Sequence, residues 1–191
     1  MNNRTKSVLK LFRPLDQSTS LASSKSFSAL YERTHLSVFR YLYGLTGGPQ
    51  QDVEDLTAEA FERAWRARRN FQGDDGAALG WLMKIARRLA IDDYRRRNAR
   101  PVTEGEIPDK IPAAYPQPEE FAVTGEEQQL LWNLVRSLPD ELREMLVLRY
   151  LLGWRVNQIA EYMEIPENTV SVNIHRTLEQ LRQQWPQLQE D

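Results

Sequence analysis

The chain has 191 residues, of which 41% are hydrophobic and 27% are charged, and it contains no cysteine. This length allows one domain or two small ones, and the lack of cysteine excludes a disulfide scaffold, a thiol nucleophile and a cysteine-ligated zinc site. With two histidines and no apolar run of about 18–20 residues, the sequence predicts no metal site and no membrane span, as is typical of a cytoplasmic protein.

The formal net charge of −2 conceals a strong asymmetry along the chain. Residues 1–100 carry 18 Lys and Arg against 11 acids, whereas residues 125–191 carry six Arg against 11 acids, which favours different partners for the two halves. Between them, residues 100–124 hold five of the ten prolines in an acidic tract that no long helix can cross. We therefore expect a mobile arm over 1–23, a domain over 24–99, a linker over 100–124 and a domain over 125–187.

Apolar residues recur at helical spacing over 27–45, 52–69 and 77–98, which predicts three helices in the first half. The apolar stripe of the first segment includes Leu30, Tyr31 and Val38. Gly47-Gly48-Pro49 should end that helix, and the turn-rich segment 70–76 should separate the second helix from the third. Alternating β-branched runs, which would indicate strands, are missing.

The second half predicts four short helices. One lies around 130–135. The next begins at Pro139 and ends at Gly153, and its apolar face includes Met145, Leu146 and Tyr150. The last two lie over 156–163 and from Pro166 onward, with apolar contacts expected at Ala160, Ile165, Val170 and Ile174. That spacing is typical of a helix-turn-helix. The expected fold is therefore all-α, with two small helical domains joined by a Pro-rich acidic linker and a helix-turn-helix in the second domain.

The third predicted helix carries an aromatic and basic face. Trp81, Lys84, Arg88 and Arg95 fall within about 60° of one another on a helical wheel. Aromatic rings that stack on bases, beside cations that attract the backbone, suit single-stranded nucleic acid. A solvated helix end whose cations complement the helix dipole is the alternative explanation.

The last predicted helix resembles a recognition helix that places its first turn in the DNA major groove. Only Arg176 and Arg182 give it positive charge, which is little for a protein that binds DNA alone. A helical bundle without DNA contact, or a protein-binding domain, remains an open alternative.

The second predicted helix begins with carboxylates at the positive end of its dipole and continues with arginines. No histidine or serine constellation accompanies these carboxylates. We therefore expect neither catalytic residues, nor a cofactor, nor a small-molecule substrate, and we interpret the chain as a binding protein rather than an enzyme.

Three segments together resemble a known family. The runs at 52–67 (DVEDLTAEAFERAWRA), 81–97 (WLMKIARRLAIDDYRRR) and 138–181 resemble, in this order, the core-binding helix, the −10-reading helix and the −35-reading domain of bacterial sigma-70-type factors. The two-domain layout over about residues 25–185 is similar to the extracytoplasmic-function (ECF) group. The resemblance implies a factor that binds the β and β′ subunits of core RNA polymerase, recognises −35 and −10 promoter elements, assists melting and is regulated by an anti-sigma factor.

The resemblance also implies roles for single residues on three surfaces. The polymerase-binding residues would be Asp52, Glu54, Asp55, Glu59, Arg63 and Arg66. The −10 residues, which would hold the melted non-template strand and a flipped-out base, would be Asn70, Phe71, Gln72, Asp74, Trp81, Lys84, Arg87, Arg88 and Arg95. The −35 residues, on duplex DNA, would be Glu167, Asn168, Thr169, Ser171, Val172, His175 and Arg176. Phe61 and Trp65 match the clamp-binding helix but fit a core position equally well.

The chain departs from the family pattern at several positions. Ser171-Val172-Asn173 stands where the family usually has a Lys-Ser-Arg-like triplet, Arg88 where asparagine is common, and Ala58 where glutamine is common. Two alternatives remain open beside the sigma-factor hypothesis. One is a dimeric helix-turn-helix regulator that binds DNA without polymerase, and the other is a decoy that binds polymerase but reads no promoter.

Overall fold

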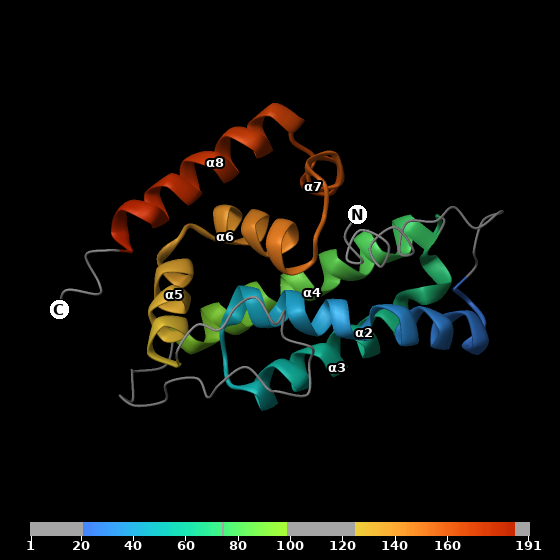
Figure 1. Ribbon diagram of the computed structural model, residues 1–191. Helices are drawn as coiled ribbons and strands as arrows, with labels where there is room; N and C mark the ends of the chain where they lie inside the picture. The colour runs from blue at the N-terminus through green and yellow to red at the C-terminus, as the bar shows by residue number, and fades with distance from the viewer. Residues whose placement is uncertain (1–20, 74, 99–124, 186–191) are drawn as a thin grey trace.

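The computed structural model describes residues 21–73, 75–98 and 125–185, where all regular structure is helical. The first half contains α2 (Ser24–Thr46), α3 (Gln50–Ala67), the 3₁₀ turn η1 (Arg68–Asn70) and α4 (Asp75–Asn98). The second half contains α5 (Gly125–Ser137), α6 (Asp140–Leu146), the π-helical turn η2 (Val147–Leu151), α7 (Val156–Met163) and α8 (Glu167–Gln184) (Figure 1). The predicted all-α class is confirmed.

Helix α2 has defined signals at both ends. The side chain of Ser23 accepts a hydrogen bond from the backbone N–H of Ser26 at 3.0 Å, which satisfies one of the unpaired donors of the first turn. At the other end Gly47 adopts a left-handed conformation with φ of 54° and donates to the carbonyl oxygen of Tyr43 at 2.7 Å. The predicted end of this helix at Gly47 is therefore confirmed.

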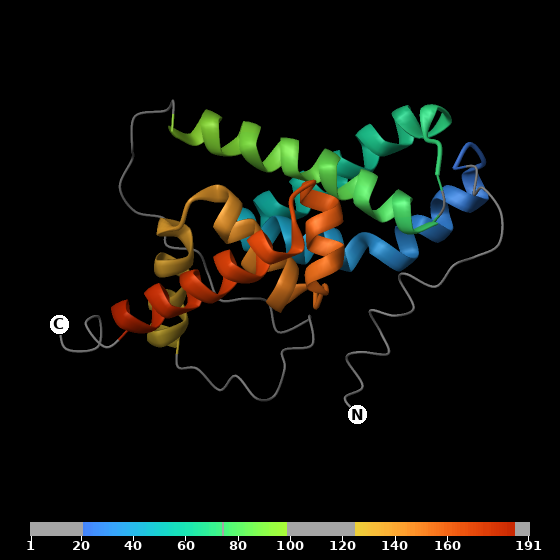
Figure 2. The ribbon, with the colours of Figure 1, turned by 90° about the horizontal axis from the view of Figure 1, so that it is seen from above.

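Helices α2, α3 and α4 pack on one another as a three-helix bundle, in which each helix contacts both of the others (Figures 1 and 2). Alanines at the contact surfaces of α3 and α4 allow the helices to approach closely, since they add little bulk. The residues between these helices include Leu30, Leu42, Val53, Ala60 and Leu82, all completely buried. Leu21, at the C-terminal end of the segment predicted as an arm, is also buried. The rest of that arm, residues 1–20, lies outside the described residues, as does the linker.

The helix-turn-helix forms where the sequence predicted it. Glu164 takes a left-handed conformation with φ of 59° at the end of α7, and Ile165 donates its N–H to the carbonyl of Ala160 at 3.0 Å. This arrangement closes the helix as a Schellman-type cap does. Ala160, Val170 and Ile174 are buried where α7 and α8 meet. Helix α8 runs along the edge of the molecule, away from α3 (Figure 1).

The two halves share one continuous hydrophobic core. Helix α6 and the η2 turn pack against α2, and both views show α6 beside the bundle formed by α2, α3 and α4 (Figures 1 and 2). Gly44 makes this contact possible, because a Cβ atom there would lie 2.7 Å from Cγ2 of Val147 and 3.2 Å from Cδ2 of Leu151. The domain boundaries remain a prediction, and the buried residues of the two halves form a single cluster.

Two tyrosines expected on apolar stripes are exposed. Tyr31 is 47% exposed and Tyr150 is 59% exposed, so these predictions are wrong. Tyr150 lies in the π-helical η2 turn. The extra residue in this turn rotates the side chains away from the apolar face that α-helical spacing predicts. In the part of the chain that the structure describes, no helix is both long enough and apolar enough to cross a membrane.

Candidate polymerase and nucleic-acid interfaces

The charged residues of α3 project from the side of the helix opposite the core. Val53, Leu56, Ala60, Phe61 and Ala64 face inward and are buried. Of the predicted polymerase-binding residues, all but Glu54 fall within about 80° of one another at 100° per residue. Glu59 is half-buried, and the others are exposed: Asp52, Glu54, Asp55, Arg63 and Arg66.

Two ion pairs run along this surface. Arg63 Nη2 lies 2.6 Å from Glu59 Oε1, and Arg66 Nη2 lies 2.6 Å from Glu62 Oε1. All four side chains are at least 41% exposed, so each pair contributes only about 0.3–0.5 kcal/mol. The surface can therefore exchange these partners for the charges of another protein at little cost.

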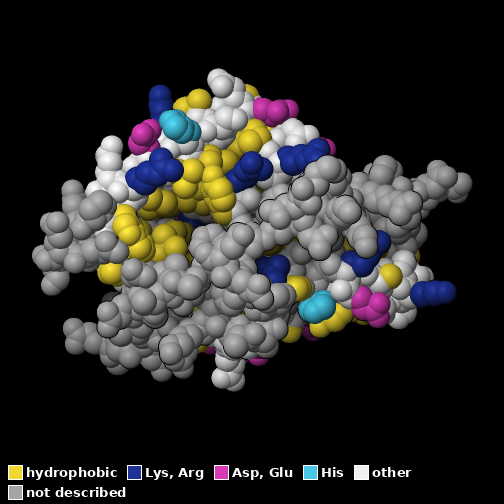
Figure 3. Space-filling view, viewed as in Figure 1, with side chains coloured by type: hydrophobic (Ala, Val, Ile, Leu, Met, Phe, Trp, Pro, Cys, Tyr) yellow, Lys and Arg dark blue, Asp and Glu magenta, His cyan; other side chains and the backbone are white. Residues whose placement is uncertain are grey.

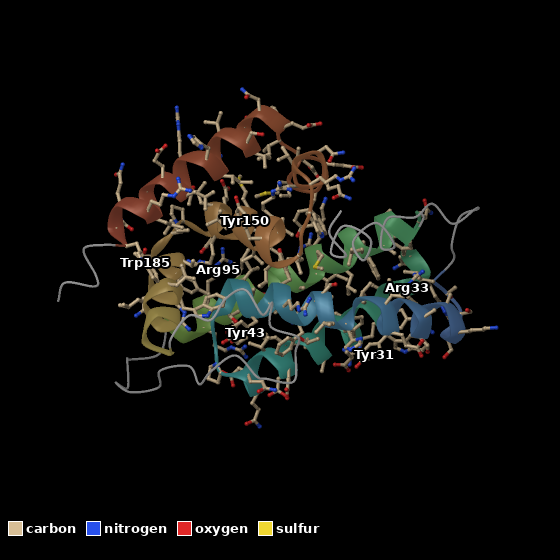
Figure 4. All side chains as sticks on the ribbon, in the orientation of Figure 1. Tyr31, Arg33, Tyr43, Arg95, Tyr150 and Trp185 are labelled. Atoms are coloured by element: carbon tan, nitrogen blue, oxygen red, sulfur yellow. The ribbon has the colours of Figure 1, made fainter. Side chains whose placement is uncertain are left out.

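Aromatic rings join the start of α2 to α3. The rings of Phe27 and Trp65 are 5.1 Å apart, and those of Tyr31 and Phe61 are 4.7 Å apart. Phe61 is 5% exposed and Trp65 is half-buried against the core, which supports the core interpretation for both. Figure 4 places Tyr31 on the side of α2 toward α3. Its exposed ring extends the α3 surface, and sequence reasoning missed it because helical spacing alone assigned Tyr31 to the core.

The segment between α3 and α4 forms an aromatic corner. The rings of Phe71 and Trp81 lie 5.1 Å apart, and both side chains are half-buried. Asn70 and Gln72 beside them are exposed. The structure thus brings four of the predicted −10 residues together at the start of α4. Asp74, which was also predicted in the segment before α4, lies outside the described residues.

Helix α4 presents the predicted cations beside this corner. Lys84, Arg88 and Arg95 are exposed, and Arg87 is half-buried. Lys84 Nζ lies 2.7 Å from Glu164 Oε1 in the turn between α7 and α8. The hydrogen bond and the positive charge of Lys84 lower the pKa of the Glu164 carboxyl. The α4 surface is therefore basic, and part of it touches the second half.

The predicted −35 residues line the outer side of α8. Val170, Ile174 and Thr177 point inward and are buried. His175 Nε2 lies 3.3 Å from Glu179 Oε2 on the exposed side. Val172 is half-buried, and the remaining predicted residues are exposed: Glu167, Asn168, Thr169, Ser171, His175 and Arg176. The first turn of α8 is therefore open to a ligand, and its unpaired backbone N–H groups suit phosphate.

A buried carboxylate joins the two halves, and sequence reasoning missed it. Glu144 on α6 is 2% exposed, and its Oε2 lies 2.7 Å from Nε of Arg87 on α4. Its Oε1 accepts a hydrogen bond from the hydroxyl of Tyr41 on α2, which in turn lies 3.1 Å from the hydroxyl of Tyr162 on α7. Because Tyr41 donates to Glu144, Tyr162 donates to Tyr41. No local pattern marks these contacts, since they join residues far apart in sequence.

This network shifts several pKa values. Burial, together with Tyr162 and Glu144, raises the pKa of Tyr41 well above its ordinary value. Burial and the charge of Glu144 likewise raise the pKa of Tyr162. Burial disfavours the charge of Arg87, but the hydrogen bond and charge of Glu144 outweigh it, so the pKa of Arg87 is raised. The network thus holds one cation and one anion together and keeps both phenols protonated.

The described residues offer no metal site. Within them, no group of three or more His, Asp or Glu side chains could hold a metal ion. A cavity of about 60 Å³ lies between α4 and α6, lined by Arg87, Asp93, Tyr94 and Arg143 among others. It is far smaller than the roughly 300–1,000 Å³ of a typical small-molecule site.

Comparison with known families identifies both halves of the chain. Residues 30–100 match sigma-70 region 2, and residues 128–181 match sigma-70 region 4. The first match spans most of α2, α3 and α4, and the second spans α5, α6, η2, α7 and most of α8. The two matches occur in the order that the sequence analysis expected.

Two curated relatives match most of the chain. The chain is 35% identical over 162 residues to the ECF RNA polymerase sigma factor SigE of Mycolicibacterium smegmatis, covering 84% of this chain but only 62% of that protein. The chain thus spans about three fifths of the length of that relative. It is 33% identical over 141 residues to the ECF RNA polymerase sigma-E factor of Escherichia coli K12, covering 69% of this chain and 72% of that protein.

A solved structure shares the fold. The sigma factor RpoE of Bartonella quintana, crystallised in complex with the anti-sigma factor NepR, matches with a TM-score of 0.61 at 17% identity, covering 83% of this chain and 96% of that one. At this identity the likeness concerns the fold alone. Both region matches and the identity to the E. coli factor lead to one conclusion: the chain belongs to the ECF family of RNA polymerase sigma factors.

Proposed function

We propose that the chain binds core RNA polymerase, directs it to promoters by recognising −35 and −10 elements, and assists strand separation at the −10 element. The proposal assigns residues 24–99 to polymerase and −10 binding and residues 125–187 to −35 binding. Its family consists of initiation factors rather than enzymes, and we propose no catalytic residue. A factor with these partners would act in the cytoplasm, where bacterial chromosomal DNA is transcribed.

The outer face of α3 would contact the β and β′ subunits of the polymerase. Exposed side chains of both signs lie along it, and their ion pairs within the helix are weak enough to be exchanged. Charged surfaces of this kind increase association rates and favour one partner over others. The exposed ring of Tyr31 at the edge of this face would add apolar contact.

The α4 surface and the aromatic corner would bind the melted −10 strand, and this juxtaposition is the observation that carries the proposal. Exposed Lys84, Arg88 and Arg95 follow the paired rings of Phe71 and Trp81 along α4, on the side of the helix that Trp81 shares. Cations attract the strand backbone, while aromatic rings stack on unpaired bases, at about 1–3 kcal/mol per base. Extracting a base from the duplex costs a few kcal/mol, so such contacts would decide which sequences open.

The outer face of α8 would read the −35 element in the major groove. Asn168, Ser171 and His175 present hydrogen-bonding groups on its exposed side. Arg176 and Arg182 are its only cations, so this helix alone would bind DNA weakly. A polymerase that tethers both halves would compensate by raising the effective concentration of α8 at the promoter.

We also propose regulation by an anti-sigma factor. The structural relative RpoE of Bartonella quintana was crystallised with the anti-sigma factor NepR. On this chain, Leu131, Tyr150 and Leu151 remain at least 39% exposed on the second half. Figure 3 shows hydrophobic atoms between Lys and Arg side chains on the face that includes this half. An exposed apolar surface of this kind suits a protein partner.

The test uses core polymerase from the same bacterium. We expect the chain to co-purify with the core enzyme and to make thymines near −10 reactive to permanganate on the promoters that the complex selects. Replacing both Arg88 and Arg95 with Ala should abolish this reactivity while co-purification persists. The control, Lys25→Ala with Arg33→Ala, removes two exposed cations of α2 that lie outside the proposed DNA-binding surfaces and should retain it.

Other outcomes would support the alternatives. Co-purification without thymine reactivity on any selected promoter would favour the polymerase-binding decoy. Tight DNA binding by the free chain, without co-purification, would favour the dimeric regulator and contradict the proposal. Loss of co-purification in the Arg88 and Arg95 variant would assign these arginines to the polymerase interface.

A further inference from the structure

Helix α8 carries an apolar side chain on its outer face. The helix lies at the edge of the molecule, and its inner face holds the buried residues Val170, Ile174 and Thr177 (Figure 1). At 100° per residue, Val172 points about 170° away from the middle of that inner face. A β-branched hydrocarbon side chain therefore stands in the middle of the face that the proposed function assigns to DNA, although it is only half-buried there.

The side chains around Val172 are polar, but the nearby ones carry no positive charge until Arg176. Asn168 is exposed and lies one turn before Val172, about 40° from it around the helix. His175 Nε2 lies 3.3 Å from Glu179 Oε2, further toward one edge of the face. Residues 167–173, which form the first two turns, contain no Lys or Arg. The part of a recognition helix that enters the groove is therefore uncharged at its middle.

This set of side chains favours A·T over G·C base pairs. In the major groove, Arg or Lys reads guanine through O6 and N7, an amide reads adenine through N6 and N7, and an apolar group contacts the C5 methyl of thymine. A carboxylate can read cytosine, but Glu167 lies about 140° from Val172, near the border of the inner face. The middle of the outer face thus holds a reader of adenine and a reader of thymine.

The spacing of Asn168 and Val172 suits neighbouring base pairs. Four residues of an α-helix span about 6 Å along its axis, and successive base pairs of B-DNA are about 3.4 Å apart. Two side chains on the same face, one turn apart, would therefore meet base pairs that are one or two steps apart.

From this arrangement we infer that α8 reads two neighbouring A·T base pairs of the −35 element: the amide of Asn168 binds an adenine, and the methyl groups of Val172 contact the C5 methyl of a thymine one or two base pairs away. The inference rests on the proposed function for the role of α8 and adds the identity of two bases. Val172 is then a specificity-determining residue that acts without a hydrogen bond.

The first experiment determines the bases. A promoter fragment selected by the complex of the chain with core polymerase is randomised over its −35 element, and the sequences that the same complex binds are read. We expect A·T pairs at two positions one or two steps apart, with Val172→Ala relaxing the preference at one and Asn168→Ala at the other. G·C pairs at the positions that these variants relax would overturn the inference and leave the proposed function intact. A complex without any −35 preference would contradict the proposed role of α8 as well.

The second experiment removes single groups from the DNA. Uracil in place of the thymine lacks only the C5 methyl, and 7-deazaadenine in place of the adenine lacks the N7 acceptor. In competition binding with the unchanged complex, uracil should weaken binding about fourfold, as the loss of one buried methyl group does. 7-Deazaadenine should weaken it about fivefold or more, since it breaks a bidentate contact.

The variants provide controls for each other. Val172→Ala should abolish the effect of uracil and keep that of 7-deazaadenine, and Asn168→Ala should do the reverse. Gln180→Ala should keep both effects, because Gln180 is an exposed residue of α8 more than two turns beyond Val172. Alanine favours helix, so circular dichroism should show unchanged helix content in all three variants. Equal sensitivity of the unchanged chain and Val172→Ala to uracil would overturn the inference and assign the A·T preference to DNA shape.

Discussion

Arg87 Nε lies 2.7 Å from Glu144 Oε2, and this ion pair links α4 of region 2 to α6 of region 4 across 57 positions of sequence. Glu144 is 2% exposed, whereas Arg87 is 36% exposed. The carboxylate therefore depends on its protein partners for hydrogen bonds, whereas the guanidinium is also accessible to water. A buried carboxylate without partners is costly, which makes Glu144 sensitive to any change that separates the two halves.

The first prediction concerns the strength of this pair. A double-mutant cycle with Arg87→Ala and Glu144→Gln should give a coupling free energy of about 2 kcal/mol in urea unfolding, because the bond joins charged groups and one of them is buried. The control cycle, Arg63→Ala with Glu59→Gln, removes an exposed pair and should give about 0.3–0.5 kcal/mol. Equal coupling in the two cycles would contradict the prediction.

The second prediction compares two glycines. Gly80→Ala should stabilise the chain by about 0.5–1 kcal/mol, since Gly80 lies inside α4 and its Cβ would meet nothing within 4 Å. Gly47→Ala should destabilise it by at least about 1 kcal/mol, because φ is 54° there and the left-handed conformation disfavours a side chain. Urea unfolding measures both changes. A stabilising Gly47→Ala would show that the chain can end α2 in another conformation.

Sequence periodicity predicted the local structure well. The three helices of region 2, the end of α2 at Gly47 and the helix-turn-helix contacts at Ala160, Val170 and Ile174 all follow from spacing and turn residues. Spacing could not predict the exposed Tyr150, since the π-helical turn breaks the α-helical period at that point.

Contacts between the halves could not be predicted from the sequence. The resemblance to sigma-70-type factors implied a DNA contact for Arg87, but its pairing with Glu144 depends on how the two halves meet. The same holds for Tyr41, which lies in an apolar region of α2 and finds its partners on α6 and α7. The three site surfaces follow from the motifs, and their role in binding remains a prediction.

The third prediction concerns alkaline pH. The folded chain raises the pKa of Tyr41 and Tyr162, so above about pH 10 the unfolded chain has lost protons that the folded chain keeps. The contribution of these tyrosines to the free energy of unfolding is therefore fully present below pH 10. It should fall as the pH rises further, by about 1.4 kcal/mol per pH unit for each tyrosine.

Urea unfolding between pH 8 and pH 11 measures this decline, and Tyr162→Phe should make it shallower. The two curves should run parallel below about pH 9, where neither phenol ionises in either state, which provides the control. An equally steep decline in Tyr162→Phe would show that other groups cause it.

The fourth prediction separates two kinds of contact on α8. Asn168→Ala should reduce discrimination among −35 sequences by about 1–3 kcal/mol in polymerase-bound complexes, since an amide can make a bidentate contact to a base. Arg176→Ala should weaken binding about equally for all sequences and reduce its salt dependence, because a phosphate contact carries no sequence information. Competition binding with −35 variants at several salt concentrations distinguishes the two. Identical effects would assign both residues to the same kind of contact.

The fifth prediction concerns the polymerase-binding face of α3. Asp55 is exposed on the side of α3 opposite the core, so Asp55→Lys should leave the free energy of unfolding within about 0.5 kcal/mol of the unchanged chain. Affinity for core polymerase should nevertheless fall at least tenfold, since a reversed charge at an interface repels the group that the carboxylate attracted.

Glu32→Lys serves as the matched control, because Glu32 is an exposed carboxylate on α2 outside the proposed surfaces. Fluorescence anisotropy of labelled chain titrated with core polymerase measures both variants. Charge reversal at Asp55 changes association mainly through long-range attraction, so its effect should diminish as salt rises from 50 to 500 mM. Equal affinities for Asp55→Lys and Glu32→Lys at low salt would move the polymerase contact away from α3, and the exposed aromatic edge at Tyr31 would then be the next surface to test.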